Sequence, residues 1–226
     1  MDTQLQPSER EIGIELEAVT LKGNLVLVPG APGLVLFVHG SGSSRFSSRN
    51  RQVAADLQAG GLATLLFDLL SPEEERIDDI TRELRFDIGL LTRRVIGVSN
   101  WLDQNPDTGG LSIGYFGAST GAAAALEAAA FFANRDDLVK AVVSRGGRPD
   151  LAMEALSSVV APTLLIVGGN DTVVIEMNRR AFDRLTAVKD FRIVPNATHL
   201  FEEPGALEEV SRLARGWFQR YLLPEG

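Results

Sequence analysis

The stretch YFGASTGAAAAL, residues 115–126, places one serine among small residues where a strand meets a helix. Apolar residues up to Ala118 indicate a buried strand, and the alanines after Gly121 indicate a helix. A chain that turns so tightly must adopt a strained backbone at Ser119, and Gly117 and Gly121 leave space for that turn. The pattern predicts a G-x-S-x-G nucleophile elbow. The alternative is a buried capping serine in a tight junction, so the chain must also supply a base.

Strands and helices alternate around this junction from residue 34 onward. Solid apolar runs such as GLVLFVHG, 33–40, are typical of parallel strands buried on both faces. The further strands are expected at 62–70, 111–119, 138–147, 161–171 and 189–199, and the helices at 47–61, 86–104, 120–134, 174–187 and 205–222, with 71–85 as a charged loop or helix. We therefore predict an α/β fold with a doubly wound, mainly parallel sheet and helices on both faces.

The N-terminal part follows a different pattern. Apolar and polar residues alternate in IGIELEAV, which predicts a half-exposed antiparallel hairpin over 12–28, with Lys22-Gly23 between its strands. No linker interrupts the sequence, so residues 1–226 are expected to form a single domain.

Composition limits the possible functions. The net charge is −8 and the isoelectric point is about 4.9, which disfavours nucleic acid or an anionic membrane as partner. Cysteine is absent, which excludes disulfides and a cysteine nucleophile. The N-terminus MDTQLQPSEREIGIE lacks the pattern of a signal peptide, and no run of about 18 apolar residues occurs. We expect a cytoplasmic protein that acts on a small molecule, and the oligomeric state stays open.

Two histidines compete for the role of base. His39 ends a buried strand, whereas His199 lies on the loop after the last strand, where a base for Ser119 is expected. Asp171, just past another strand, could orient that base, although such residues often only cap turns or helices. A histidine in a surface loop is likewise often without function. The chain order Ser119, Asp171, His199 is nevertheless that of a Ser-Asp-His triad at the carboxyl ends of strands.

These segments resemble the α/β-hydrolases, and within them the dienelactone hydrolase-like group. The resemblance rests on FVHGSGSS, GASTG, GGNDTVV and NATHLFEEPG, and extends over about 34–222. It implies Ser119 as nucleophile, His199 as general base and then acid, and Asp171 as the carboxylate that orients it. The dienelactone hydrolases proper use a cysteine nucleophile, which this chain lacks, so the lactone substrate does not follow from the resemblance.

The loop HGSGSSRFSSRNR, 39–51, lies where such hydrolases form half of the oxyanion hole. The resemblance assigns the two backbone N–H donors to Ser41 and Thr120, with His39 bracing the loop. A phosphate-binding loop is the rival interpretation. It is disfavoured because the lysine of a P-loop and the third glycine of a dinucleotide fingerprint are both missing.

Arg45, Arg145 and Arg148 follow strands at the same edge and could hold an anionic group of the substrate. Ordinary salt bridges, with Asp150 or the 73–75 glutamates, are the alternative interpretation.

The spacing leaves no space for a large lid. Between the serine helix and Asp171 only 149–160 is unassigned, and it is expected to form one short helix. No cysteine and no pair of histidines at ligand spacing are present, so neither a metal nor another cofactor is expected.

The sequence thus favours a serine hydrolase that cleaves a small ester, thioester or lactone through an acyl-enzyme. Acyl transfer or amide cleavage on the same residues is one alternative. A catalytically silent scaffold that serves as a binding module is the other.

Overall fold

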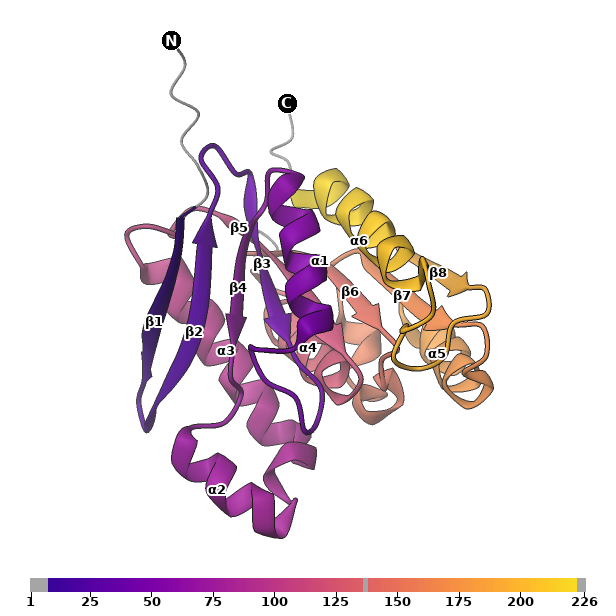
Figure 1. Ribbon diagram of the computed structural model, residues 1–226, viewed down its shortest axis with the longest axis horizontal. Coiled ribbons are helices and arrows are strands. Elements are labelled where there is room, and N and C mark those ends of the chain that lie inside the picture. Colours follow the sequence, from indigo (N-terminus) through magenta and orange to yellow (C-terminus); the bar gives the residue numbers. More distant parts are fainter. Residues whose placement is uncertain (1–7, 136–137, 223–226) are drawn as a thin grey trace.

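The computed structural model describes residues 8–135 and 138–222, and its core is an eight-stranded sheet (Figure 1). The strand order is β1-β2-β4-β3-β5-β6-β7-β8. The strands are β1 Ser8–Leu16, β2 Val19–Leu27, β3 Gly33–Val38, β4 Ala63–Phe67, β5 Ser112–Ala118, β6 Val139–Arg145, β7 Thr163–Gly168 and β8 Lys189–Val194. The β1–β2 and β2–β4 pairs are antiparallel and the remaining pairs are parallel, which confirms the predicted mainly parallel sheet with an N-terminal hairpin.

Six helices surround the sheet within the described residues. They are α1 Ser48–Ala59, α2 Pro72–Thr81, α3 Ile88–Gln104, α4 Thr120–Phe131, α5 Thr172–Arg184 and α6 Ala206–Leu222. Buried side chains of α3, α4 and α5 belong to one core cluster, and those of α1 and α6 belong to a second. Figure 1 shows α1 and α6 in front of the sheet and α3 behind it, so helices cover both faces as predicted.

Strand β3 shows why its residues are apolar throughout. Leu34, Leu36 and Val38 pack in the α3/α4 cluster, while Val35 and Phe37 pack in the α1/α6 cluster. A strand buried on both faces therefore has no polar position, which explains the continuous apolar run in the sequence.

The hairpin turn lies elsewhere than the sequence suggested. Residues 17 and 18 form the turn between β1 and β2, and Lys22-Gly23 lies inside β2. Gly23 packs closely there: a Cβ at this position would lie 2.9 Å from a Leu65 methyl group, so a larger residue would displace that side chain. The glycine in the sequence therefore marks a close contact between β2 and a side chain of β4, and not a turn.

The charged segment 71–85 begins as a helix. Ser71 and Glu74 form a reciprocal capping box with Pro72 at the first helical position, and α2 is followed by a 3₁₀ turn, Leu84–Phe86. Figure 1 shows α2 projecting below the carboxyl ends of β3 and β4. The 149–160 segment forms two short 3₁₀ helices, Pro149–Ala152 and Leu156–Ser158, where one helix was expected. Hence the covering element follows β4, and no lid domain enters between β6 and β7.

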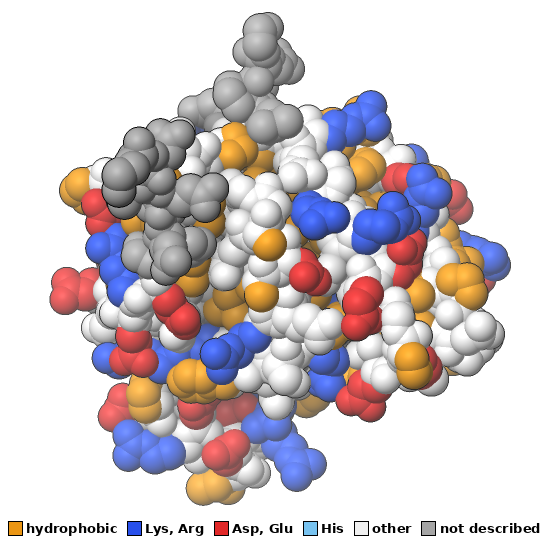
Figure 2. Space-filling model, turned by 45° about the horizontal axis from the view of Figure 1, so that its top comes forward, with side chains coloured by type: hydrophobic (Ala, Val, Ile, Leu, Met, Phe, Trp, Pro, Cys, Tyr) orange, Lys and Arg blue, Asp and Glu red, His pale blue; other side chains and the backbone are white. Residues whose placement is uncertain are grey.

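The surface carries both signs of charge. Lysine or arginine and acidic side chains are interspersed over the face shown in Figure 2. No helix of the described chain is both long enough and apolar enough to cross a membrane. The first seven residues, which belong to the N-terminal stretch considered above, lie outside the described residues.

Candidate active site

Ser119 occupies a strained turn between β5 and α4. Its φ of 49° and ψ of −124° are unusual for a residue with a side chain. A Cβ at Gly117 would lie 2.5 Å from Ala122 Cα, and one at Gly121 would lie 2.3 Å from the carbonyl oxygens of Val38 and His39. The Ser119 side chain does not cap α4, so the capping interpretation fails. The elbow geometry predicted from the sequence is present.

Asp171 and His199 are joined by a hydrogen bond. Asp171 Oδ2 lies 2.7 Å from His199 Nδ1, and the side chains are 15% and 39% exposed, respectively. Asp171 is the N-cap residue of α5, yet its carboxylate makes no capping bond to that helix. The carboxylate therefore orients the imidazole, and Nε2 of His199 remains the ring nitrogen that can accept a proton.

His199 lies next to the end of β6, the strand that pairs with β5, and β5 leads into the elbow. A Cβ at Gly146, whose φ is +51°, would be 3.5 Å from His199 Cε1. The Ser119 N–H donates to the carbonyl oxygen of Arg145, the residue before Gly146, at 3.3 Å. Among the described residues no hydrogen bond joins Ser119 Oγ to His199, and such bonds often tighten only when substrate binds.

His39 has no free ring nitrogen. Its Nε2 accepts the Leu69 N–H at 3.1 Å, which requires Nδ1 to carry the proton and donate to the Gly40 carbonyl oxygen at 3.0 Å. The side chain is buried, and this burial lowers its pKa, against smaller raising effects of the Gly40 bond and the Asp68 charge. His39 is therefore neutral and fixed, a geometry that braces the loop after β3.

The loop after β3 packs directly on the elbow. A Cβ at Gly40 would lie 3.0 Å from Ser119 Cβ, so this residue must be a glycine or the loop must move away. The Ser41 N–H donates to Thr120 Oγ1 at 2.9 Å. Thr120 is the first residue of α4, so its N–H has no carbonyl acceptor within that helix. These are the two amides assigned to an oxyanion hole. The Ser41 N–H already donates to the Thr120 hydroxyl, which a substrate oxygen would have to replace as acceptor.

The structure does not bring the three arginines together. Arg45 binds Asp68 and Glu11, both at 2.7 Å, and Arg148 binds Asp150 through two bonds of 2.8 Å. Since both guanidinium groups already have carboxylate partners in the protein, the salt-bridge interpretation describes them better than a substrate clamp.

Arg145 differs from the other two. It is 8% exposed, its Nη2 lies 3.4 Å from Asn50 Oδ1, and its Nε and Nη1 lack hydrogen-bond partners. Burial, together with the charge of Arg49, lowers its pKa to about 10. The guanidinium lies 6.0 Å from the centre of the Phe201 ring, on the segment that follows His199. Arg145 therefore packs against the segment that carries Phe201.

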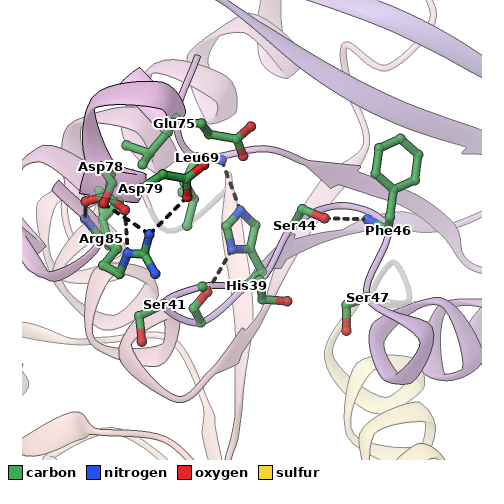
Figure 3. A pocket seen from close by; sticks show the side chains of 15 residues that line it. His39, Ser41, Ser44, Phe46, Ser47, Leu69, Glu75, Asp78, Asp79 and Arg85 are labelled. Atoms are coloured by element: carbon green, nitrogen blue, oxygen red, sulfur yellow. Dashed lines mark hydrogen bonds and ion pairs between the residues drawn. The ribbon is translucent and has the colours of Figure 1, made fainter. Parts of the chain in front are cut away.

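A cavity of about 460 Å³ opens beside the β3 loop (Figure 3). One wall is the serine-rich loop with Gly40 and Ser41, and the opposite wall is α2 and the turn after it. Sequence reasoning missed the residues of that second wall, which include Glu75, Asp78, Asp79 and Arg85. The signal was available in SPEEE, because a capping box directly after a buried strand places a helix at the carboxyl edge of the sheet.

Within residues 8–135 and 138–222, no group of three or more histidine or acidic side chains could hold a metal ion.

Comparison with known proteins gives a consistent result. No family model matches the chain. The crystal structure of dienelactone hydrolase from Anabaena variabilis is 60% identical, covers 96% of this chain and 99% of that chain, and has a TM-score of 0.92. An esterase of Pyrococcus furiosus, 19% identical, covers 98% of this chain and 96% of its own with a TM-score of 0.75, and so shares the fold.

Two curated relatives are longer proteins. They come from Mycobacterium tuberculosis strains CDC 1551 and H37Rv, are named as candidate phosphoribosyl transferases, and are 53% identical over 228 residues. The match covers 100% of this chain and 50% of each of them, so the chain spans about half the length of these relatives. The likeness to the Anabaena enzyme, by contrast, extends over nearly all of both chains, and the protein therefore belongs to the dienelactone hydrolase family of α/β-hydrolases.

Proposed function

We propose that the protein is a serine hydrolase that cleaves a small carboxylic ester, thioester or lactone through an acyl-enzyme at Ser119. The observation that carries the proposal is the strained Ser119, whose hydroxyl caps no helix, at the same sheet edge as the 2.7 Å Asp171–His199 pair. The hydrolase fold, shared with esterases of known structure, supports the same reaction class.

The first step is attack on the carbonyl carbon. Asp171 holds His199 Nδ1–H, so Nε2 accepts the Ser119 Oγ proton while Oγ forms a bond to carbon. The carbonyl oxygen gains the negative charge and is stabilised by the Thr120 N–H and by the Ser41 N–H, which exchanges Thr120 Oγ1 for that oxygen. His39 stays neutral and keeps the Ser41 loop in place.

The remaining steps return the enzyme to its starting state. His199 gives its proton to the leaving oxygen or sulfur as that bond breaks, which leaves the acyl group on Ser119. Water then loses a proton to His199 Nε2 and attacks the acyl carbon, and the proton returns to Ser119 Oγ as the acid leaves. In a lactone the leaving oxygen stays attached to the acyl chain, so a single hydroxy acid is released.

The family name does not decide the substrate. A serine stands where dienelactone hydrolases proper use cysteine, so ester, thioester and lactone substrates all remain in the proposal. Acyl transfer or amide cleavage would use the same residues. A silent binding module is disfavoured because it has no need for a strained serine and an oriented histidine. We do not extend the transferase name to this chain, because it belongs to proteins about twice as long. A cytoplasmic location stays a prediction.

A fluorophosphonate probe tests this proposal directly. The purified protein should be labelled at Ser119, and the Ser119→Ala variant should be neither labelled nor active on a panel of 4-nitrophenyl esters. Labelling at another residue, or full esterase activity in Ser119→Ala, would refute the proposal. Hydroxamate formation when hydroxylamine is added to the ester assay separates an acyl-enzyme from direct attack by water.

A further inference from the structure

The cavity beside the β3 loop adjoins the proposed nucleophile but lies on the opposite side from the histidine. In the sheet, β3 and β4 flank β5 on one side, and β6, β7 and β8 follow on the other. The cavity lies beyond β3 and β4, and Gly40 on its wall contacts Ser119. Asp171 and His199 follow β7 and β8. The nucleophile therefore lies between the cavity and the proposed general acid.

This arrangement indicates where the leaving group and the acyl chain of a substrate would lie. The leaving group must lie beside His199, because that residue protonates its departing atom. With the carbonyl carbon at Ser119 and its oxygen at the Ser41 amide, the acyl chain extends away from His199 and toward β3 and β4. The cavity, whose volume of about 460 Å³ suits a small organic group, is then the acyl subsite.

The lining of the cavity has an excess of negative charge. Three carboxylates, those of Glu75, Asp78 and Asp79, line it together with one guanidinium, that of Arg85. Arg85 is bound by Asp78 through Nε and by Asp79 at 3.4 Å, and the fifth ionisable group, His39, is neutral. Glu75 makes no ion pair among the described residues, so its carboxylate is available to a ligand in the cavity.

The surroundings of Glu75 favour a cation. Partial burial raises the pKa of this carboxyl group, and the charges of Asp68 and Asp79 raise it further, against a lowering effect of Arg45. The exposed ring of Phe46 stands at the other side of the cavity (Figure 3), with the Arg45 guanidinium 4.3 Å from its centre, and adds apolar surface to the lining. The apolar side chains of Leu69, Leu70 and Leu91 supply contacts for the methylene groups of an acyl chain.

Resting on the proposed function, we propose that this cavity binds the acyl part of the substrate and prefers acyl chains that end in a cation over neutral or anionic chains of the same shape. Glu75 is the specificity-determining residue. A carboxylate-bearing acyl chain is disfavoured, because Asp78 and Asp79 already balance the charge of Arg85 and Glu75 adds a further negative charge.

Matched 4-nitrophenyl esters test the proposal with one constant leaving group. The acids are 4-(trimethylammonio)butanoic, 5,5-dimethylhexanoic and glutaric acid, which share three methylenes and differ in the charge at the end. We expect kcat/KM, corrected for spontaneous hydrolysis, to be roughly 3- to 10-fold higher for the cationic ester than for its neutral isostere, and lowest for the anionic ester. Added salt should shrink the preference because the cavity is open to water.

Variants localise the effect. Glu75→Gln should remove the preference and Glu75→Lys should reverse it, whereas Asp183→Asn, an equal charge change on exposed α5, should leave it intact. Charge on the alcohol side is the second control: a choline ester and its 3,3-dimethylbutyl isostere should respond equally to Glu75→Gln. Equal kcat/KM for the three acyl esters, an anionic preference, or a cationic preference that survives Glu75→Gln would overturn the inference.

Binding separates this inference from the proposed function. The N-methylamides of the three acids carry no ester, and calorimetric titration into the Ser119→Ala protein measures the subsite without turnover. Tighter binding of the cationic amide, lost in Ser119→Ala/Glu75→Gln, supports the subsite even if esters are not cleaved. Ester cleavage that depends on Ser119, without any charge preference, would retain the function and reject the subsite.

Discussion

The two histidines of this protein lie at the same edge of one sheet, yet their environments are opposite. His39 follows β3, is 8% exposed, and has both ring nitrogens bonded to backbone atoms of Gly40 and Leu69. His199 follows β8, has a side chain that is 39% exposed, and has one ring nitrogen bonded to Asp171. A histidine can exchange protons only if one nitrogen is free and both charge states are tolerated. The comparison teaches that the residue type alone does not identify a general base. The hydrogen bonds of the two ring nitrogens show which histidine has a nitrogen free to accept a proton.

The largest expected loss of activity follows from replacing His199. His199→Ala should lower kcat on 4-nitrophenyl esters by roughly four to six decades, because no other residue is oriented to take the Ser119 proton. Stability by chemical denaturation should change little, since the side chain is partly exposed. Ester hydrolysis at near wild-type rates in a folded His199→Ala protein would break the comparison.

Asp171→Asn should come next, with a loss of roughly four decades in kcat. The amide nitrogen can donate to His199 Nδ1, which favours the tautomer whose proton sits on Nε2 and so removes the acceptor that Ser119 needs. Asp171 makes no capping bond to α5, so the melting temperature should stay near that of the wild type. A large loss of stability with modest loss of kcat would instead indicate a structural carboxylate.

Gly121→Ala tests how closely the His39 segment packs on the elbow. A Cβ there would be 2.3 Å from the His39 carbonyl oxygen. Backbone atoms cannot move aside as a flexible side chain could, so the free energy of unfolding should fall by about 3 kcal/mol or more. Gly216→Ala, in α6 with no atom within 4 Å of the new Cβ, is the matched control. It should be neutral or stabilising by up to about 1 kcal/mol. Equal stability of the two variants would contradict the packing described here.

His39→Ala should cost stability in the first place. The Leu69 N–H loses its acceptor in a buried position, which corresponds to about 1–3 kcal/mol in urea unfolding. Activity should fall far less than in His199→Ala, through disorder of the Ser41 loop. The reverse pattern, with His39→Ala inactive at full stability, would exchange the roles of the two histidines.

The smallest effect is a pH dependence of stability that originates at His39. Burial lowers the pKa of this residue in the folded protein below its usual value of 6.5. Between that lowered pKa and about pH 6.5 the unfolded chain binds a proton that the folded chain does not, so stability falls as pH decreases through this window. The slope should not exceed about 1.4 kcal/mol per pH unit. Subtracting the His39→Gln curve isolates this contribution, and identical slopes in both proteins would show that His39 is not buried as described.

Much of the fold could be predicted because local patterns agree with tertiary packing. β3 is apolar at every position because both of its faces are buried, and Gly117 and Gly121 flank Ser119 because the elbow excludes side chains. The hairpin turn was misplaced because Gly23 serves a contact between β2 and the side chain of Leu65, which no local pattern reveals. The 149–160 segment breaks into two 3₁₀ helices for reasons that its sequence does not show.

The sequence by itself indicated the family, the mainly parallel sheet, and Ser119, Asp171 and His199 as the candidate catalytic residues. These follow from residue types at fixed positions relative to strand ends, and strand ends are encoded locally by apolar runs and glycines. Only the tertiary structure decided which groups are free. Arg45 and Arg148 are occupied by carboxylates, His39 is occupied by backbone atoms, and Glu75 is left facing a cavity. Partners far apart in the chain determine such occupancy, so it cannot be inferred from local sequence.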